Sequence, residues 1–168
     1  MMPVAGQAAA MMEVNHQTAV AFATENASHL IQFSPITSPE EATEDLPFFA
    51  LGSGQASADV FLAFIRKIFW PRELPSLSEG ELATIWTLDE IKRQIPGFVG
   101  GETKVATLKQ SENGKWKVFS LSEDDIITHR QGIIAIEGTM PEAAKVATGA
   151  AMIAEAIPEP EEAQPETH

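Results

Sequence analysis

The dipeptide Asn113-Gly114 constrains the fold of this chain more than any other feature, because it predicts where the polypeptide reverses direction. Asn-Gly readily supplies the positive φ angles of a tight type I′ turn, and such turns join antiparallel strands. Apolar and polar residues alternate over 103–108, and 116–121 is a second strand-like run. We therefore expect a β-hairpin in the second half of the chain.

A second pair of strand-like segments lies near the start of the chain. Residues 18–24 and 29–33 are apolar and rich in β-branched or aromatic side chains, and the polar residues 25–28 separate them. Prolines and acidic residues over 34–47 predict a loop. A short apolar strand is expected over 48–51, where Gly52-Ser53-Gly54 follows.

Two amphipathic helices are expected between the hairpins. The first runs from Gly54 to Trp70, and its apolar residues recur at helical spacing on one face. The second is expected to begin at Ser78, with Glu81 completing a capping box, and to end at Pro96. The apolar residues are Val60, Phe61, Phe64, Ile65 and Ile68 in the first helix, and Leu82, Ile85, Trp86, Leu88 and Ile91 in the second.

The two ends of the chain differ in character from its middle. Residues 3–14 are rich in Ala and Met and predict a helix, and a short helix is expected over 123–131. An Ala-rich helix is expected over 141–157, and the proline- and glutamate-rich residues 158–168 predict a disordered tail. The predicted organisation is one domain over 1–139, a C-terminal helix over 140–157 and the acidic tail.

Antiparallel strand pairs grouped with paired helices predict an α+β fold, in which antiparallel sheets are layered with helices. The helix pair can cover one face of the strands. The other face needs a different cover, for which we expect a second copy of the chain or a related subunit.

Charge and residue types exclude several classes of function. With 11 basic and 24 acidic residues, the net charge is −13, which argues against nucleic acid or an anionic membrane as partner. The chain contains no cysteine, so thiol catalysis and disulfides are excluded. The four histidines lack metal-ligand spacing, and the acidic residues over 40–45 lack the glycine-punctuated loop of a calcium site. We expect no metal, no cofactor, no membrane span and a cytoplasmic location.

The order of these features resembles the later half of the proteasome-type N-terminal nucleophile (Ntn) hydrolases. The resemblance begins with the hairpin TAVAFATENASHLIQF and the acidic loop after it. It continues through FFALGSGQASADVFLAFI, where an apolar strand ends in Gly-Ser-Gly and opens a helix, and through SLSEGELATIWTLDEI and GGETKVATLKQSENGKW. It covers residues 11–131 and implies part of a four-layer αββα sandwich.

The chain departs from the family at the catalytic residues. Family enzymes use an N-terminal threonine whose α-amino group acts as the base, and an Asp and a Lys follow it. Those residues precede the family's first helix pair, and this chain begins near the end of that pair. The segment PGFVGG has neither Asp nor Ser where the family places an acidic-serine element. The resemblance therefore implies the fold without a complete catalytic apparatus.

Thr18 is one candidate nucleophile, because TAVAFA is similar to the first strand of an active family member. Cleavage after Gln17 would free its amino group. Gly-Ser-Gly follows only 35 residues later, which is too short for the family's intervening strands and helix pair. An ordinary strand threonine is the favoured interpretation.

Ser53 is the second candidate, since its hydroxyl lies between two glycines where a strand turns into a helix. There it could orient a nucleophile beside free backbone N–H groups. Alternatively, Gly-Ser-Gly only makes the turn, and Ser53 or Ser57 caps the helix. Leu51 and Gln55 occupy the positions at which a nucleophile elbow requires glycine.

Three functional interpretations follow. The first is a proteasome-like structural or assembly subunit without complete catalytic machinery, which forms homo-oligomers or associates with related subunits. The second is an active threonine peptidase or amidase of the same superfamily, with Thr18 unmasked or with upstream residues that this chain lacks. The third is an acidic adaptor unrelated to proteolysis. The aromatic residues of the helix pair are expected in its core, and any that are exposed would mark a subunit contact.

Overall fold

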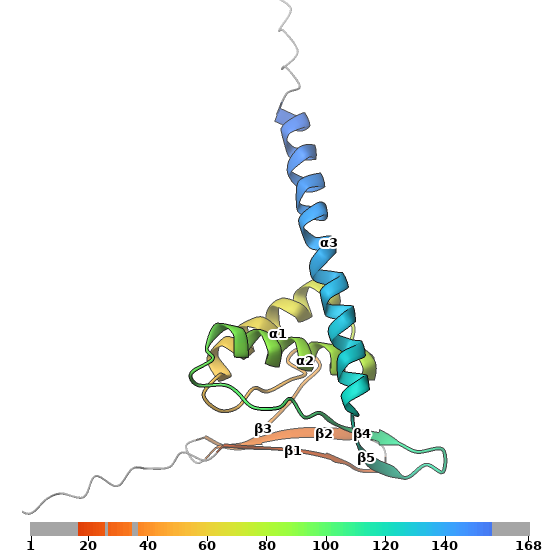
Figure 1. Ribbon diagram of the computed structural model, residues 1–168. Helices are drawn as coiled ribbons and strands as arrows, with labels where there is room; N and C mark the ends of the chain where they lie inside the picture. Colours follow the sequence, from red (N-terminus) through yellow and green to blue (C-terminus); the bar gives the residue numbers. More distant parts are fainter. Residues whose placement is uncertain (1–16, 26, 35–36, 156–168) are drawn as a thin grey trace, which may run out of the picture. The chain divides into compact units, whose positions relative to one another are not determined.

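The computed structural model describes residues 17–25, 27–34 and 37–155, with side chains described as far as residue 148. Within these residues the chain is α+β, with small antiparallel sheets and three helices, as the sequence predicts (Figure 1). The helix expected over 3–14 and the tail over 158–168 lie outside the described residues. The chain divides into two compact units, Met1–Ser122 and Glu123–His168.

The first sheet contains three strands in the order β1-β2-β3. Strands β1 (Thr18–Ala23) and β2 (Ser28–Phe33) form the expected hairpin, in which Val20 lies opposite Ile31. The acidic segment expected to be only loop also contributes β3 (Glu40–Glu41), which pairs with β2. His29 Nδ1 lies 2.6 Å from Glu41 Oε1, so a side-chain contact supports this short ladder.

The second sheet is the expected hairpin of β4 (Ala106–Gln110) and β5 (Trp116–Ser120). Its turn is not the predicted type I′, because Gly114 has a positive φ of 76° and Asn113 does not. The Gly114 N–H donates to the Ser111 carbonyl, and the Ser111 N–H donates to the Lys115 carbonyl, both at 2.8 Å. This pattern is that of a three-residue loop with Gly114 in the left-handed conformation.

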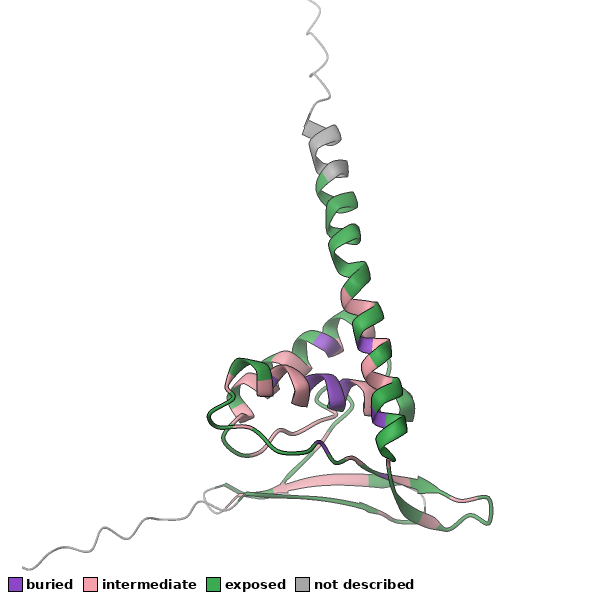
Figure 2. Cartoon of the chain, viewed as in Figure 1, coloured by how far each residue is buried: buried purple, intermediate pink, exposed green. Residues whose placement is uncertain are grey.

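Helices α1 (Gln55–Phe69) and α2 (Leu77–Gln94) pack together and form the core of the first unit. Ile65 and Ile85 are almost fully buried, and the Trp86 ring meets Phe61 edge-on at 5.8 Å between centroids. The buried residues of the two helices lie mainly on α2 (Figure 2). The predicted core face of α1 is therefore only partly correct, since Val60, Phe64 and Ile68 are exposed.

The N-cap of helix α2 lies two residues before the predicted one. The sequence holds two overlapping Ser-x-x-Glu patterns, and the structure uses the first: Ser76 Oγ accepts from the Glu79 N–H, while Glu79 Oε2 accepts from the Ser76 N–H. Ser78 is therefore not the cap. Glu81 takes no part in the capping box and instead accepts a hydrogen bond of 2.9 Å from the Thr107 side chain of β4.

Two other expectations about elements were wrong. Residues 48–51 belong to no helix or strand and form no ladder with any described strand. In the second unit, a single helix α3 (Glu123–Glu155) replaces the two helices expected over 123–131 and 141–157. Pro141 lies inside it and removes one backbone hydrogen bond, while the good helix formers Glu142, Ala143 and Ala144 follow it.

Candidate functional site

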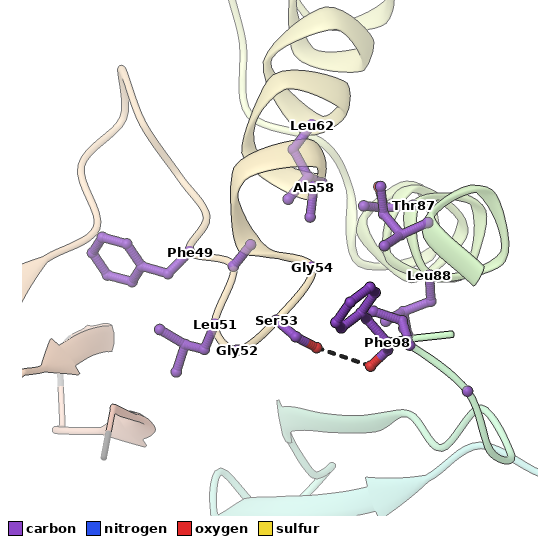
Figure 3. Close-up of a pocket in the computed structure, with 14 residues that line it drawn as sticks. Phe49, Leu51, Gly52, Ser53, Gly54, Ala58, Leu62, Thr87, Leu88 and Phe98 are labelled. Carbon is purple, nitrogen blue, oxygen red and sulfur yellow. Dashed lines mark hydrogen bonds between the residues drawn. The ribbon is translucent and has the colours of Figure 1, made fainter. Parts of the chain in front are cut away.

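A cavity of 410 Å³ lies in the first unit, where residues 49–54 enter α1 (Figure 3). Its walls come from this turn, from one face of α1 and α2, and from the loop after α2. The lining residues are Phe49, Ala50, Leu51, Gly52, Ser53, Gly54, Ala58, Leu62, Thr87, Leu88, Ile91, Phe98, Val99 and Gly100. The segment predicted as a short strand thus contributes one wall of the cavity instead.

Two glycines shape the entrance to α1. Gly52 has a φ of +91°, a left-handed conformation that side chains rarely adopt, and it sets the direction of the turn. A Cβ on Gly54 would lie 2.8 Å from Ile91 Cγ2 and 3.0 Å from Val99 Cγ2. Gly54 therefore allows the start of α1 to approach α2 and the loop after it.

Ser53 lies on this cavity, but its hydroxyl is already engaged. Ser53 Oγ donates a hydrogen bond of 2.9 Å to the carbonyl oxygen of Phe98, which Figure 3 draws as a dashed line. Gly54 is the N-cap of α1, and no side chain caps the helix. The expectation that Ser53 or Ser57 caps α1 was therefore wrong, because the Ser53 hydroxyl connects the turn to the loop after α2.

The remaining polar side chain of the cavity wall is also bonded. Thr87 Oγ1 donates a hydrogen bond of 2.7 Å to the Ala83 carbonyl within α2. None of the fourteen lining residues has a carboxyl, imidazole, amino or guanidinium side chain. The cavity can therefore hold a small apolar group, but its own side chains supply no general acid or base.

Lys92 of α2 has a structural role. Its Nζ donates to the Gly101 carbonyl at 2.8 Å and to Thr103 Oγ1 at 2.7 Å. The ammonium group thereby fixes the chain between α2 and β4. Sequence reasoning did not single out Lys92, Phe98 or Val99, because nothing in their spacing shows that the loop after α2 folds back onto the turn before α1.

Thr18 lies apart from the residues that line this cavity. It is the first residue of β1, it is exposed, and it pairs with Phe33 across the hairpin. The cavity lining includes Ser53 and not Thr18. The structure therefore places the two candidate catalytic residues in different local environments.

The acidic loop before α1 is held in place by Arg66. Arg66 Nη2 donates to the Glu44 carbonyl at 3.1 Å, and Nη1 donates to the Glu73 carbonyl.

Among the described residues, no group of three or more His, Asp or Glu side chains could hold a metal ion. Of the helices within the described ranges, none has the length and apolar character that crossing a bilayer would require.

Comparison with protein-family models, with curated proteins and with solved structures finds no match to this chain. The Ntn-hydrolase resemblance therefore depends on the ordered sequence motifs alone.

Proposed function

We propose that this chain is a proteasome-like protein of the Ntn-hydrolase class that acts as a cytoplasmic structural or assembly subunit. In this proposal it associates with copies of itself or with related subunits and does not hydrolyse peptide bonds on its own. The observation that carries the proposal is the apolar surface that the first unit leaves exposed, on β1 and β2 and on α1.

The exposed face of β1 and β2 is apolar, as is usual for a sheet face that another element or chain covers. Val20 and Phe22 of β1 are 41% and 39% exposed, and Phe33 of β2 is 43% exposed. Side chains alternate along a strand, so these three share one face with Ile31. Apolar surface gathered in this way is typical of an interface rather than of a free surface.

Helix α1 supports the same conclusion. Phe61, Ile65 and Phe69 face α2, whereas Val60, Phe64 and Ile68 are 71%, 48% and 52% exposed. The exposed three are spaced four residues apart and so lie along one stripe. The two stripes adjoin on the helix, so the apolar surface of α1 is wider than the part that α2 covers, which is typical of a helix with a second packing neighbour.

The candidate catalytic residues favour an assembly role over autonomous hydrolysis. Thr18 is within the chain, so its nitrogen is a peptide nitrogen and cannot serve as the base unless the bond after Gln17 is cleaved. Ser53 already donates its hydroxyl proton to a carbonyl oxygen, beside a wall without titratable side chains. Both observations support a protein that retains the fold without the chemistry.

Native mass spectrometry tests the proposal, with the intact subunit mass measured in the same experiment and fluorogenic peptides assayed in parallel. We expect an oligomer of unprocessed subunits of 18.1 kDa and no peptide hydrolysis. A monomer at all concentrations would overturn the assembly role and favour an adaptor. Loss of residues 1–17 together with peptidase activity that Thr18→Ala abolishes would establish the threonine hydrolase instead.

A further inference from the structure

We propose that the assembly is joined at β1, through the edge that no described strand pairs with, which pairs antiparallel with β1 of a second copy of the chain. This inference deepens the proposed function and depends on it, because it names the strand through which two copies associate. The paired strands would unite two three-stranded sheets across a two-fold axis.

The first step is that β1 is an edge strand. Among the described residues, the sheet order is β1-β2-β3, so β1 has a hydrogen-bonded strand on one side only. Strand β4 comes close to β1, but no ladder joins them. Residues 18–22 are exposed and Ala23 is half-buried, which leaves most of the strand accessible.

The second step is that nothing in β1 opposes pairing. Natural edge strands are commonly protected by charged residues, proline or a bulge, since their free N–H and C=O groups are a template for another chain. The sequence TAVAFA has no charged residue and no proline, and all six of its residues pair regularly with β2. The net charge of −13 is carried elsewhere in the chain.

The third step is that β1 can pair with itself. A two-fold axis through Val20 places that residue opposite Val20 of the partner subunit, and Phe22 opposite Thr18 of the partner subunit. The alanines at 19 and 21 then oppose each other on the other face. This register keeps the apolar face of one sheet continuous with that of the other, whereas a shift by one residue would place the two apolar faces on opposite sides.

Charge substitutions at Val20 provide a direct test. In this register, Val20→Lys or Val20→Glu places two like charges directly opposite each other, so each variant alone should weaken dimerisation by about tenfold or more. A mixture of the two variants should restore pairing as a heterodimer, detected by its mass in native spectra. The same substitutions at Val118, an exposed valine of β5, serve as the matched control and should leave the oligomer unchanged.

A second variant does not depend on the tolerance of the strand for charge. The chain has no cysteine, so Val20→Cys carries its only thiol. Residues facing each other across an antiparallel pair have Cα atoms about 4.5–5.5 Å apart, within reach of a disulfide. Mild oxidation should convert Val20→Cys into a covalent dimer far faster than Val118→Cys.

The outcomes separate the two proposals. A monomeric wild-type protein overturns the assembly role and this interface with it. An oligomeric wild type with Val20 variants that remain oligomeric, and with a Val20→Cys that does not cross-link, overturns only the role of β1. Three results together would establish β1 as the interface: both charged variants dissociate, mixing them restores pairing, and only Val20→Cys cross-links.

Discussion

At Gly54 the start of α1 packs closely against α2 and the loop after it. As the N-cap of α1 it needs no special φ, yet the space for a side chain is already filled by Ile91 and Val99. The sequence marks Gly54 only as part of a turn. Its second property, the close approach of α1 to α2, depends on residues about forty positions away and becomes visible only in the folded chain.

Gly54→Ala should therefore destabilise the protein by about 1–3 kcal/mol, because the new methyl group overlaps Ile91 and overfills a packed region. Urea unfolding followed by tryptophan fluorescence measures the loss. Gly80→Ala is the matched control: Gly80 lies inside α2 with open space around its Cβ position, so the same change should stabilise by about 0.5–1 kcal/mol. Two shifts of the same sign would contradict this explanation.

Glu79 is the other residue whose environment leads to a prediction. Hydrogen bonds to its carboxylate from the Ser76 side chain, the Trp70 side chain and the Ser76 backbone lower the pKa of Glu79 from 4.5. Lowering the folded-state pKa means that the charged form is favoured by folding. Its contribution is therefore complete above the unfolded pKa and is lost as the pH falls through the lowered folded value.

The wild type should accordingly be more stable than Glu79→Gln at neutral pH, with a difference that shrinks as the pH falls below about 4.5. Chemical unfolding of both proteins between pH 3 and pH 7 measures the two curves. In a Ser76→Ala background, which removes the first of these hydrogen bonds, the pH dependence of the difference should be smaller. A difference that widened in acid would have the wrong sign.

At the scale of elements, hydrophobic patterning predicted the two hairpins and the helix pair, because local periodicity and turn residues determine them. The N-cap of α2 was missed because Ser76 and Ser78 both begin a Ser-x-x-Glu pattern. The two patterns differ in that Glu79 bonds Ser76, whereas Glu81 accepts a hydrogen bond from Thr107 of β4, and this contact is not visible in the sequence. The type of the 111–115 turn was missed because Ser111 Oγ lies within hydrogen-bonding distance of Asn113 Oδ1 and the Lys115 carbonyl. Strand β3 was missed because two glutamates carry no periodicity.

Arg66 connects α1 to two loops through the carbonyl groups of Glu44 and Glu73. Arg66→Met should therefore destabilise the protein by about 1–3 kcal/mol, because both carbonyls lose a charged donor. Lys67→Met changes the neighbouring exposed cation and should alter stability by less than about 0.5 kcal/mol. Thermal unfolding compares the two, and equal losses would show that the positive charge of α1, rather than the Arg66 geometry, is responsible.

The hydrogen bond from Thr107 to Glu81 links β4 to α2 within the first unit. Thr107→Val keeps the shape of the side chain and removes the donor, so we expect a loss of about 1 kcal/mol. Thr84→Val is the control, since the exposed Thr84 bonds only to a carbonyl of its own helix, Gly80. If the two substitutions cost the same, the link between strand and helix contributes nothing beyond local helix effects.

For the whole molecule, the sequence predicted the α+β class, since that follows from patterning. The cover expected over the strands stays a prediction. The site was less predictable. The turn at Ser53 was visible in the sequence, but its partner Phe98 was not, because a hydrogen bond across 45 residues leaves no local pattern. The exposure of Val60, Phe64 and Ile68 was also hidden, because an apolar stripe looks the same whether this chain or another covers it.

Association of whole molecules should make the melting temperature depend on concentration. If two copies bind in the native state only, mass action stabilises the fold as protein is added. Scanning calorimetry from micromolar to hundreds of micromolar should therefore show a rising midpoint for the wild type. The Val20→Lys protein should have an unfolding midpoint that does not depend on concentration. A rise in its midpoint equal to that of the wild type would exclude β1 as the interface.

The two edge strands of the three-stranded sheet differ in charge, and this difference limits how far the proposed association can proceed. Strand β3 ends the sheet with Glu40 and Glu41, both exposed, whereas β1 ends it without charge. Two molecules that meet at β1 present glutamates on both outer margins. In the proposed pair, these glutamates would oppose the addition of a further strand at either outer edge, so association through β1 would end at two molecules.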